Sequence, residues 1–180
     1  MTANASDPVP HPNPRFAVPT PLRLSFKTMS TVAPGPTSKL AWHIFAKPAR
    51  RIRPDRYSVW DEGEPFTVEA AGHELPAWSW GDGPTVLLLH GWSSTATSMS
   101  GFVRPLVAAG FRVAAYDAFA HGSSPGVTTS GPEMARHLNE IADRLEARHV
   151  VAHSMGTVVL GFAVRGGLDV QRSVLLNAPA

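Results

Sequence analysis

A serine lies between an apolar strand-like run and an apolar helix-like run in the segment HVVAHSMGTVV, and this serine is Ser154. A serine hydroxyl is a weak nucleophile unless a sharp turn exposes it and a nearby base takes its proton. Ala152 and Gly156, two positions before and two after the serine, are small enough for strand and helix to pass close together there. With His153 and Met155 between them, they predict a strand-to-helix turn that presents the Ser154 hydroxyl as a nucleophile.

The elements that must position this serine alternate along the chain from residue 57 onward. Alternating apolar positions around the turn Ala71-Gly72-His73-Glu74 predict an antiparallel hairpin, and continuous apolar runs such as TVLLL are typical of strands buried on both faces. The predicted strands are 66–70, 75–80, 85–89, 111–116, 149–153 and 173–176, and the predicted helices are 99–109, 134–145 and 155–164. Gly110 is expected to end the first of these helices, and the Ser130-x-x-Glu133 spacing of a capping box is expected to open the second. This order predicts an α/β fold with a mostly parallel, doubly wound sheet and an amino-terminal antiparallel hairpin.

Two further polar stretches follow buried strands of this predicted sheet. His90-Gly91-Trp92 comes directly after 85–89, and Asp117 to Ser124 comes directly after 111–116. Ligands of such sheets bind at the carboxyl ends of the strands. Both stretches are therefore expected at the same edge of the sheet as Ser154.

Together with Asn177-Ala178-Pro179 at the end of the last predicted strand, these stretches give residues 64–180 a resemblance to the α/β-hydrolase fold family. A single pentapeptide of the Ser154 kind occurs often by chance. Four matches in the family's order do not, and the resemblance implies that family's fold and a serine-hydrolase site.

The resemblance also implies roles for individual residues. The backbone N–H groups of Trp92 and Met155 correspond to the oxyanion hole, with the amino-terminal end of the following helix adding its positive dipole. The remaining matches correspond to structural positions of the motifs: His90, Gly91, Ala152, His153, Gly156, Asp117 and Gly122. Ala152 and Ala120 stand where the family usually has Gly.

The triad acid and base are expected to lie outside this chain. In the family the order is serine, acid, histidine, and Asp117 follows too early a strand to be the usual acid. None of the eight histidines has a position in the sequence that makes it a good candidate for the catalytic base. We therefore expect the chain to be the amino-terminal part of an enzyme, truncated after the strand ending near Leu176 and inactive alone.

The expected reaction is acyl transfer to water on a small ester, thioester or lactone, without metal or other cofactor. Two alternatives stay open: a non-catalytic interaction protein on the same scaffold, and a cofactor-free peroxidase or C–C hydrolase of the same fold. Trp92 and Phe119 indicate either an apolar acyl pocket or core packing.

The amino-acid composition excludes several kinds of site and protein. The chain has 43% hydrophobic residues and no cysteine, which excludes a disulfide framework and a thiolate metal site. It has no secretory signal pattern and no apolar run long enough to span a bilayer. A cytoplasmic protein with a small-molecule substrate is expected, and its oligomeric state stays open.

Charge divides the chain into an extension, residues 1–56, and a partial hydrolase domain, residues 57–180. The extension is rich in proline and has nine Lys or Arg residues against two acids, a net charge of +7, whereas the remainder has seven against twelve, or −5. We expect partial disorder, with a short helix over 38–46. The cluster KPARRIRPDR is either a solvated linker or a weak contact for an anionic membrane. No nucleic-acid motif accompanies it.

Overall fold

The computed structural model describes residues 19–50 and 58–179, which divide into two compact units meeting in sequence between Ile44 and Phe45. The predicted boundary at residue 56 and the arginines of the basic cluster beyond Arg50 lie outside the described residues, as do residues 1–18. Among the helices that the structure describes, none combines the length and the hydropathy needed to cross a bilayer.

The second unit contains one six-stranded sheet in the order β1-β2-β4-β3-β5-β6. Its strands are β1 (Glu64–Ala70), β2 (His73–Trp80), β3 (Thr85–Leu89), β4 (Arg112–Tyr116), β5 (His149–His153) and β6 (Arg172–Leu176). The pairs β1·β2 and β2·β4 are antiparallel, and the other three are parallel. The predicted fold class is confirmed, and the hairpin turn is tighter than expected, since only Ala71 and Gly72, both at positive φ, separate its strands.

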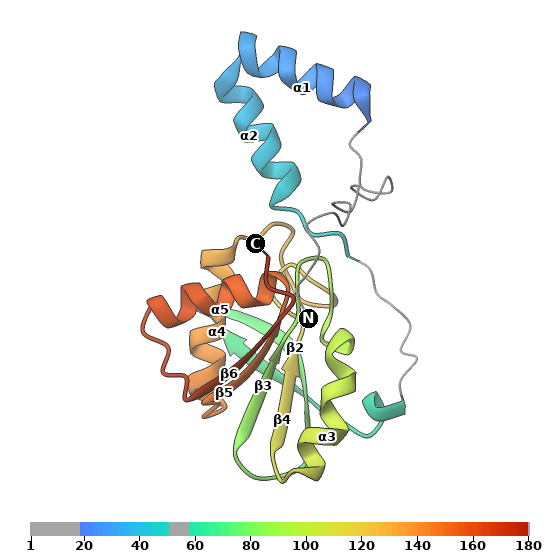
Figure 1. Cartoon of the computed structure of the whole chain (residues 1–180), viewed down its shortest axis with the longest axis vertical. Coiled ribbons are helices and arrows are strands. Elements are labelled where there is room, and N and C mark those ends of the chain that lie inside the picture. Colours follow the sequence, from blue (N-terminus) through green and yellow to red (C-terminus); the bar gives the residue numbers. More distant parts are fainter. Residues whose placement is uncertain (1–18, 51–57, 180) are drawn as a thin grey trace, which may run out of the picture. The chain divides into compact units, whose positions relative to one another are not determined.

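Helices cover both faces of this sheet (Figure 1). One face carries α4 (Gly131–Arg144) and α5 (Met155–Arg165), and the other carries a 3₁₀ segment (Ala96–Phe102) and α3 (Val103–Ala108). Strand β3 has side chains in both cores: Leu87 and Leu89 pack in the α4–α5 core, while Val86 and Leu88 pack with Met99. The apolar run therefore forms a strand because both of its faces are covered.

The helix predicted over 99–109 is divided in the structure. Its first part is the 3₁₀ segment, and the α-helix begins only at Val103. Pro105 has no N–H and so cannot donate to the carbonyl of Gly101, which favours a helix start that places Pro105 in the first turn. Gly110, at φ +83, follows the helix, as the pattern predicted.

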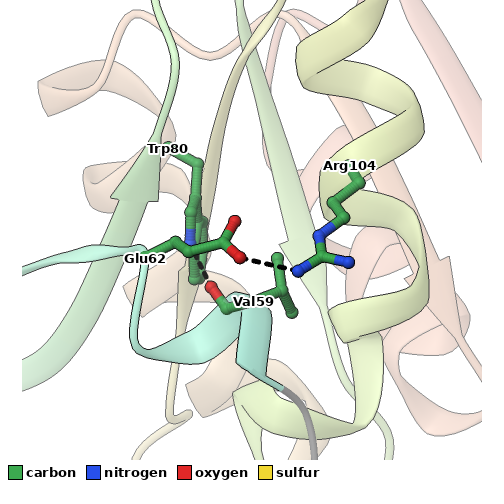
Figure 2. A network of polar contacts seen from close by, with 4 residues as sticks. All are labelled: Val59, Glu62, Trp80 and Arg104. Atoms are coloured by element: carbon green, nitrogen blue, oxygen red, sulfur yellow. Dashed lines mark hydrogen bonds and ion pairs between the residues drawn. The ribbon is translucent and has the colours of Figure 1, made fainter.

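Residues 58–62 close the α3 side of the sheet, as Figure 2 shows. The indole Nε1 of Trp80 donates to the carbonyl oxygen of Val59 at 2.8 Å, and the Trp60 ring lies 4.8 Å from that of Trp80. Arg104 on α3 pairs with Glu62 at 2.6 Å, but both side chains are largely exposed. The indole contacts, which are buried, therefore hold this segment more firmly than the ion pair does.

The described part of the extension consists of α1 (Thr20–Val32) and α2 (Pro34–Phe45). The helix predicted over 38–46 is confirmed and starts earlier, at Pro34. Helix α1 is regular structure within the stretch expected to be disordered or loosely docked. Pro19 at its N-cap and Pro21 in its first turn are compatible with a helix because the first-turn N–H groups have no intrahelical acceptor.

Candidate active site

The turn that carries Ser154 is a single residue. Strand β5 ends at His153 and helix α5 begins at Met155. Ser154 has φ +53° and ψ −124°, a conformation that costs a non-glycine residue free energy. Its N–H donates to the carbonyl of Leu176 on β6 at 2.9 Å. A β-carbon at Gly156 would lie 2.8 Å from the backbone oxygens of Leu89 and His90, so only glycine fits there.

The Ser154 hydroxyl is half-buried and does not cap the helix that it precedes. The Ser154 carbonyl instead accepts the Thr157 N–H at 2.9 Å and the Thr157 hydroxyl at 2.7 Å. The first N–H groups of α5, including that of Met155, have no acceptor within the helix. Their partial positive charge therefore lies at the turn that carries Ser154.

The His90-Gly91-Trp92 loop lies directly against this turn. A β-carbon at Gly91 would be 3.0 Å from the Ser154 β-carbon and 3.2 Å from the His153 carbonyl oxygen. The absence of a side chain at Gly91 is what lets the loop approach the serine. The tertiary structure thus brings the loop that contains Trp92 close to Ser154, which Met155 follows directly in sequence.

His90 ties two loops together through both ring nitrogens. Nδ1 donates to the Gly91 carbonyl at 2.8 Å, and Nε2 accepts the Ala118 N–H at 3.0 Å. The ring is fully buried, and burial lowers the pKa of His90 to about 4. A neutral ring with both nitrogens occupied is a brace for the loops and has no lone pair left for the Ser154 proton.

Asp117 braces the same edge from β4. Its Oδ1 accepts the Ala96 N–H and its Oδ2 accepts the Ser123 N–H, each at 2.9 Å. A β-carbon at Gly122 would lie 2.1 Å from Oδ2. Burial raises the pKa of Asp117, while the two backbone donors oppose that shift. These contacts are those of a residue that holds loops, as the sequence predicts, and none of them reaches Ser154.

Ala120 and His121 form the turn that follows Asp117. Ala120 has φ +64°, which explains in physical terms why a glycine is usual there. His121 is buried, its Nδ1 lies 2.9 Å from the Phe119 carbonyl, and burial lowers its pKa to about 4. The Trp92 ring stands edge-on to it at 5.1 Å. His121 therefore supports the Trp92 side chain.

Among residues 19–50 and 58–179, no histidine ring is hydrogen-bonded to the Ser154 hydroxyl. His153 is half-buried beside Gly91. Phe119 packs in the core and stacks on His137 at 5.0 Å, so the core interpretation holds for Phe119. Within the same described ranges, no three acidic or histidine side chains gather in a way that could hold a metal ion.

Sequence reasoning missed one segment at this site. Residues 45–50, which belong to the same unit as the sheet, contact Trp92, Ser93 and the loop after β4. The sequence signal is weak: Pro48 ends the preceding helix, and nothing local indicates which loops the following residues contact.

Comparison with known proteins agrees with the fold of the sheet unit. The model of the alpha/beta hydrolase family matches residues 86–180. A non-heme chloroperoxidase of Kitasatospora aureofaciens is 34% identical over 120 residues, covering 63% of this chain and 44% of the relative. The 2-hydroxy-6-oxononadienedioate/2-hydroxy-6-oxononatrienedioate hydrolase of Escherichia coli is 40% identical over 80 residues, covering 40% of this chain and 28% of the relative.

Solved structures of other hydrolases have a similar fold. A mutant epoxide hydrolase of Vigna radiata aligns with a TM-score of 0.60 and 26% identity, covering 66% of this chain and 40% of the other. The thioesterase domain from the curacin biosynthetic pathway aligns with a TM-score of 0.59 and 26% identity, covering 65% and 45%. The chain thus spans less than half the length of each of these relatives.

Proposed function

The chain belongs to the alpha/beta hydrolase family, and from this premise we propose that it supplies the nucleophile and the oxyanion hole of a serine hydrolase acting on a small ester, thioester or lactone. The observation that carries the proposal is the strained Ser154 turn at the start of α5, whose hydroxyl does not cap the helix. The Gly91 contact places a second loop against the same residue.

In the proposed reaction, Ser154 Oγ attacks the carbonyl carbon of the substrate, and its proton passes to a base. The carbonyl oxygen becomes an oxyanion that accepts hydrogen bonds from the Trp92 and Met155 amides. One such donor contributes about 3 kcal/mol to transition-state stabilisation. Water then releases the acyl group and restores the serine.

The proposed base and its acid partner come from outside residues 1–180. His90 and His121 are buried with lowered pKa values and serve as loop supports. The family's order, in which acid and histidine follow the nucleophile, places both after Ser154. Reading the coding region beyond residue 180 tests this part: an Asp or Glu followed by a His, each after a predicted strand, supports it, and a stop codon contradicts it.

The nucleophile is tested by labelling the full-length protein with a fluorophosphonate and locating the adduct by peptide mass spectrometry. We expect labelling at Ser154, its loss in Ser154→Ala, and no change in Ser173→Ala, which removes an exposed serine of β6. Hydrolysis of a p-nitrophenyl ester should fall at least a thousandfold in Ser154→Ala. Equal turnover by the two variants would overturn the proposal.

The named relatives raise two rival reactions within the same fold. One is a hydrolase of a 2-hydroxy-6-oxo dienedioate and another a chloroperoxidase, so C–C bond hydrolysis and peroxidase chemistry both remain candidate reactions. A panel containing an alkyl ester, a vinylogous 1,5-diketone, and peroxide with a halide salt and a halogen-accepting organic compound separates them. A preference for either of the last two by more than tenfold would replace the ester proposal.

We further propose that α1 and α2 attach the protein to an anionic membrane surface. Large apolar side chains of both helices are exposed: Leu22, Leu24, Met29, Val32, Leu40, Trp42 and Ile44. Residues 8–54 contain no Asp or Glu, while Arg23, Lys27 and Lys39 lie on the same two helices. Nucleic acid would attract these cations but leave the apolar side chains in water, whereas a lipid surface satisfies both.

Vesicle flotation tests this attachment. We expect the full-length protein to float with vesicles of about one-third phosphatidylglycerol and not with pure phosphatidylcholine, because each cation near an anionic surface contributes about 1 kcal/mol. Arg23→Gln with Lys27→Gln should weaken binding, whereas Thr28→Ala should not. Equal flotation with neutral vesicles, or binding to duplex DNA in place of vesicles, would contradict the proposal.

A further inference from the structure

Residues 45–50 form a strap that is fastened to the loops around the candidate site. The Thr129 N–H donates to the Ala46 carbonyl at 2.8 Å, and the Ala49 N–H donates to the Ser93 hydroxyl at 2.9 Å. The Arg50 guanidinium donates to the carbonyls of Ser124, at 2.8 Å, and of Gly126. The strap is thereby fixed to the loops that follow β3 and β4.

Burial alternates along residues 45–49 of the strap. Ala46 and Pro48 are buried, while Phe45, Lys47 and Ala49 are exposed. One side of the strap therefore packs against the loops, and the other side is exposed. The buried positions explain how a segment with few hydrogen bonds keeps its place.

Phe45 lies at the start of the strap and extends the site toward solvent. Its ring stacks on that of Trp92 with centroids 5.7 Å apart and an interplanar angle of 14°. Trp92 directly follows Gly91, which touches Ser154. Phe45 remains 60% exposed, so the stack on Trp92 leaves part of this residue uncovered.

We propose that the strap is a wall of the substrate entrance and that Phe45, with Trp92 behind it, determines specificity by binding the apolar acyl chain of the substrate. The inference rests on the proposed function, since it assigns the substrate preference of the same serine. Neither the family motifs nor the pattern around Ser154 includes the strap, which lies far upstream of them in sequence.

The physical consequence is a dependence on acyl-chain length. A chain of six carbons can lie along the exposed aromatic face and remove it from water, while an acetyl group is too short to do so. Because the contact is with a part of the substrate that does not react, it stabilises the bound substrate and the transition state equally. Its loss should therefore raise KM and leave kcat nearly unchanged.

The experiment compares p-nitrophenyl hexanoate with p-nitrophenyl acetate, which share a leaving group, in the full-length protein. Phe45→Ala should lower kcat/KM for the hexanoate roughly five- to tenfold, through KM, and change the acetate less than twofold. Phe45→Trp should retain the preference. Phe162→Ala, which removes an exposed phenylalanine from α5, is the matched control and should change neither ester.

A second variant tests the strap itself. Arg50→Ala removes the guanidinium contacts to the Ser124 and Gly126 carbonyls, so the hexanoate preference should fall in the same direction as in Phe45→Ala. If the ratio of kcat/KM for the hexanoate to that for the acetate is unchanged in both variants while turnover still depends on Ser154, the proposed role of the strap is wrong and the proposed function is unaffected. Turnover that does not depend on Ser154 overturns both.

Discussion

Helices α1 and α4 have nearly the same length and very different surroundings. Of the 14 residues of α4, six are buried, and the Ser130 hydroxyl caps its first turn by accepting the Glu133 N–H at 3.3 Å, as the sequence predicts. Of the 13 residues of α1, none is buried, and its N-cap, Pro19, makes no side-chain bond. An apolar stripe in the sequence therefore predicts that one face of a helix is apolar, but it does not predict which other element packs against that face.

The strongest test of this contrast is truncation of matched apolar side chains. Ile141→Ala in α4 should lower the free energy of unfolding by about 2–5 kcal/mol, because Ile141 is fully buried and leaves a cavity. Leu24→Ala in α1 should change it by less than about 0.5 kcal/mol. Urea unfolding followed by tryptophan fluorescence measures both. A comparable loss in Leu24→Ala would mean that α1 is packed in solution.

The second test uses pH, because the sheet unit contains buried histidines whereas His43 of α2 is exposed. The pKa of His90 is about 4 in the folded protein and 6.5 when exposed, so the unfolded state binds more protons between those values. The contribution of His90 to the free energy of unfolding is therefore fully present above pH 6.5. About 3 kcal/mol is lost as the pH falls toward 4. His121 acts in the same direction, and the raised pKa of Asp117 acts in the opposite one.

Unfolding curves at pH 7, 6, 5 and 4 check this dependence. His90→Asn should flatten the curve even if it lowers stability at pH 7, since the titrating group is gone. His43→Asn, at an exposed position, is the control and should leave the curve unchanged. A curve of equal slope with and without His90 would show that its ring is accessible to protons in the native state.

The smallest expected effect concerns the helix cap. Ser130→Ala should cost about 1 kcal/mol, because the Glu133 N–H loses its acceptor at the start of α4. Ser130→Asp keeps an acceptor and should restore most of that loss. Thermal unfolding measures both variants. A loss with Asp equal to that with Ala would mean that the hydroxyl, rather than any acceptor, is required.

Much of the sheet unit could be predicted because its signals are local. TVLLL at β3 and the alternation in β1 and β2 indicate strands, and the Ser130-x-x-Glu133 spacing indicates the start of α4. The Ser154 turn is equally local, since its small neighbours are two residues away. The ambiguity between pocket and core for Phe119 could not be resolved in this way, because its partner His137 lies on a different element.

The sequence by itself determined the order of strands and helices, the family and the residue proposed as nucleophile, since each depends on residues a few positions apart. Only the tertiary structure decided that His90 has both nitrogens occupied and that residues 45–50 lie on the loops of the candidate site. The strap joins Arg50 to the carbonyls of Ser124 and Gly126, more than seventy residues away. Contacts of that kind depend on how the whole chain folds around the sheet, and no local pattern of residues encodes them.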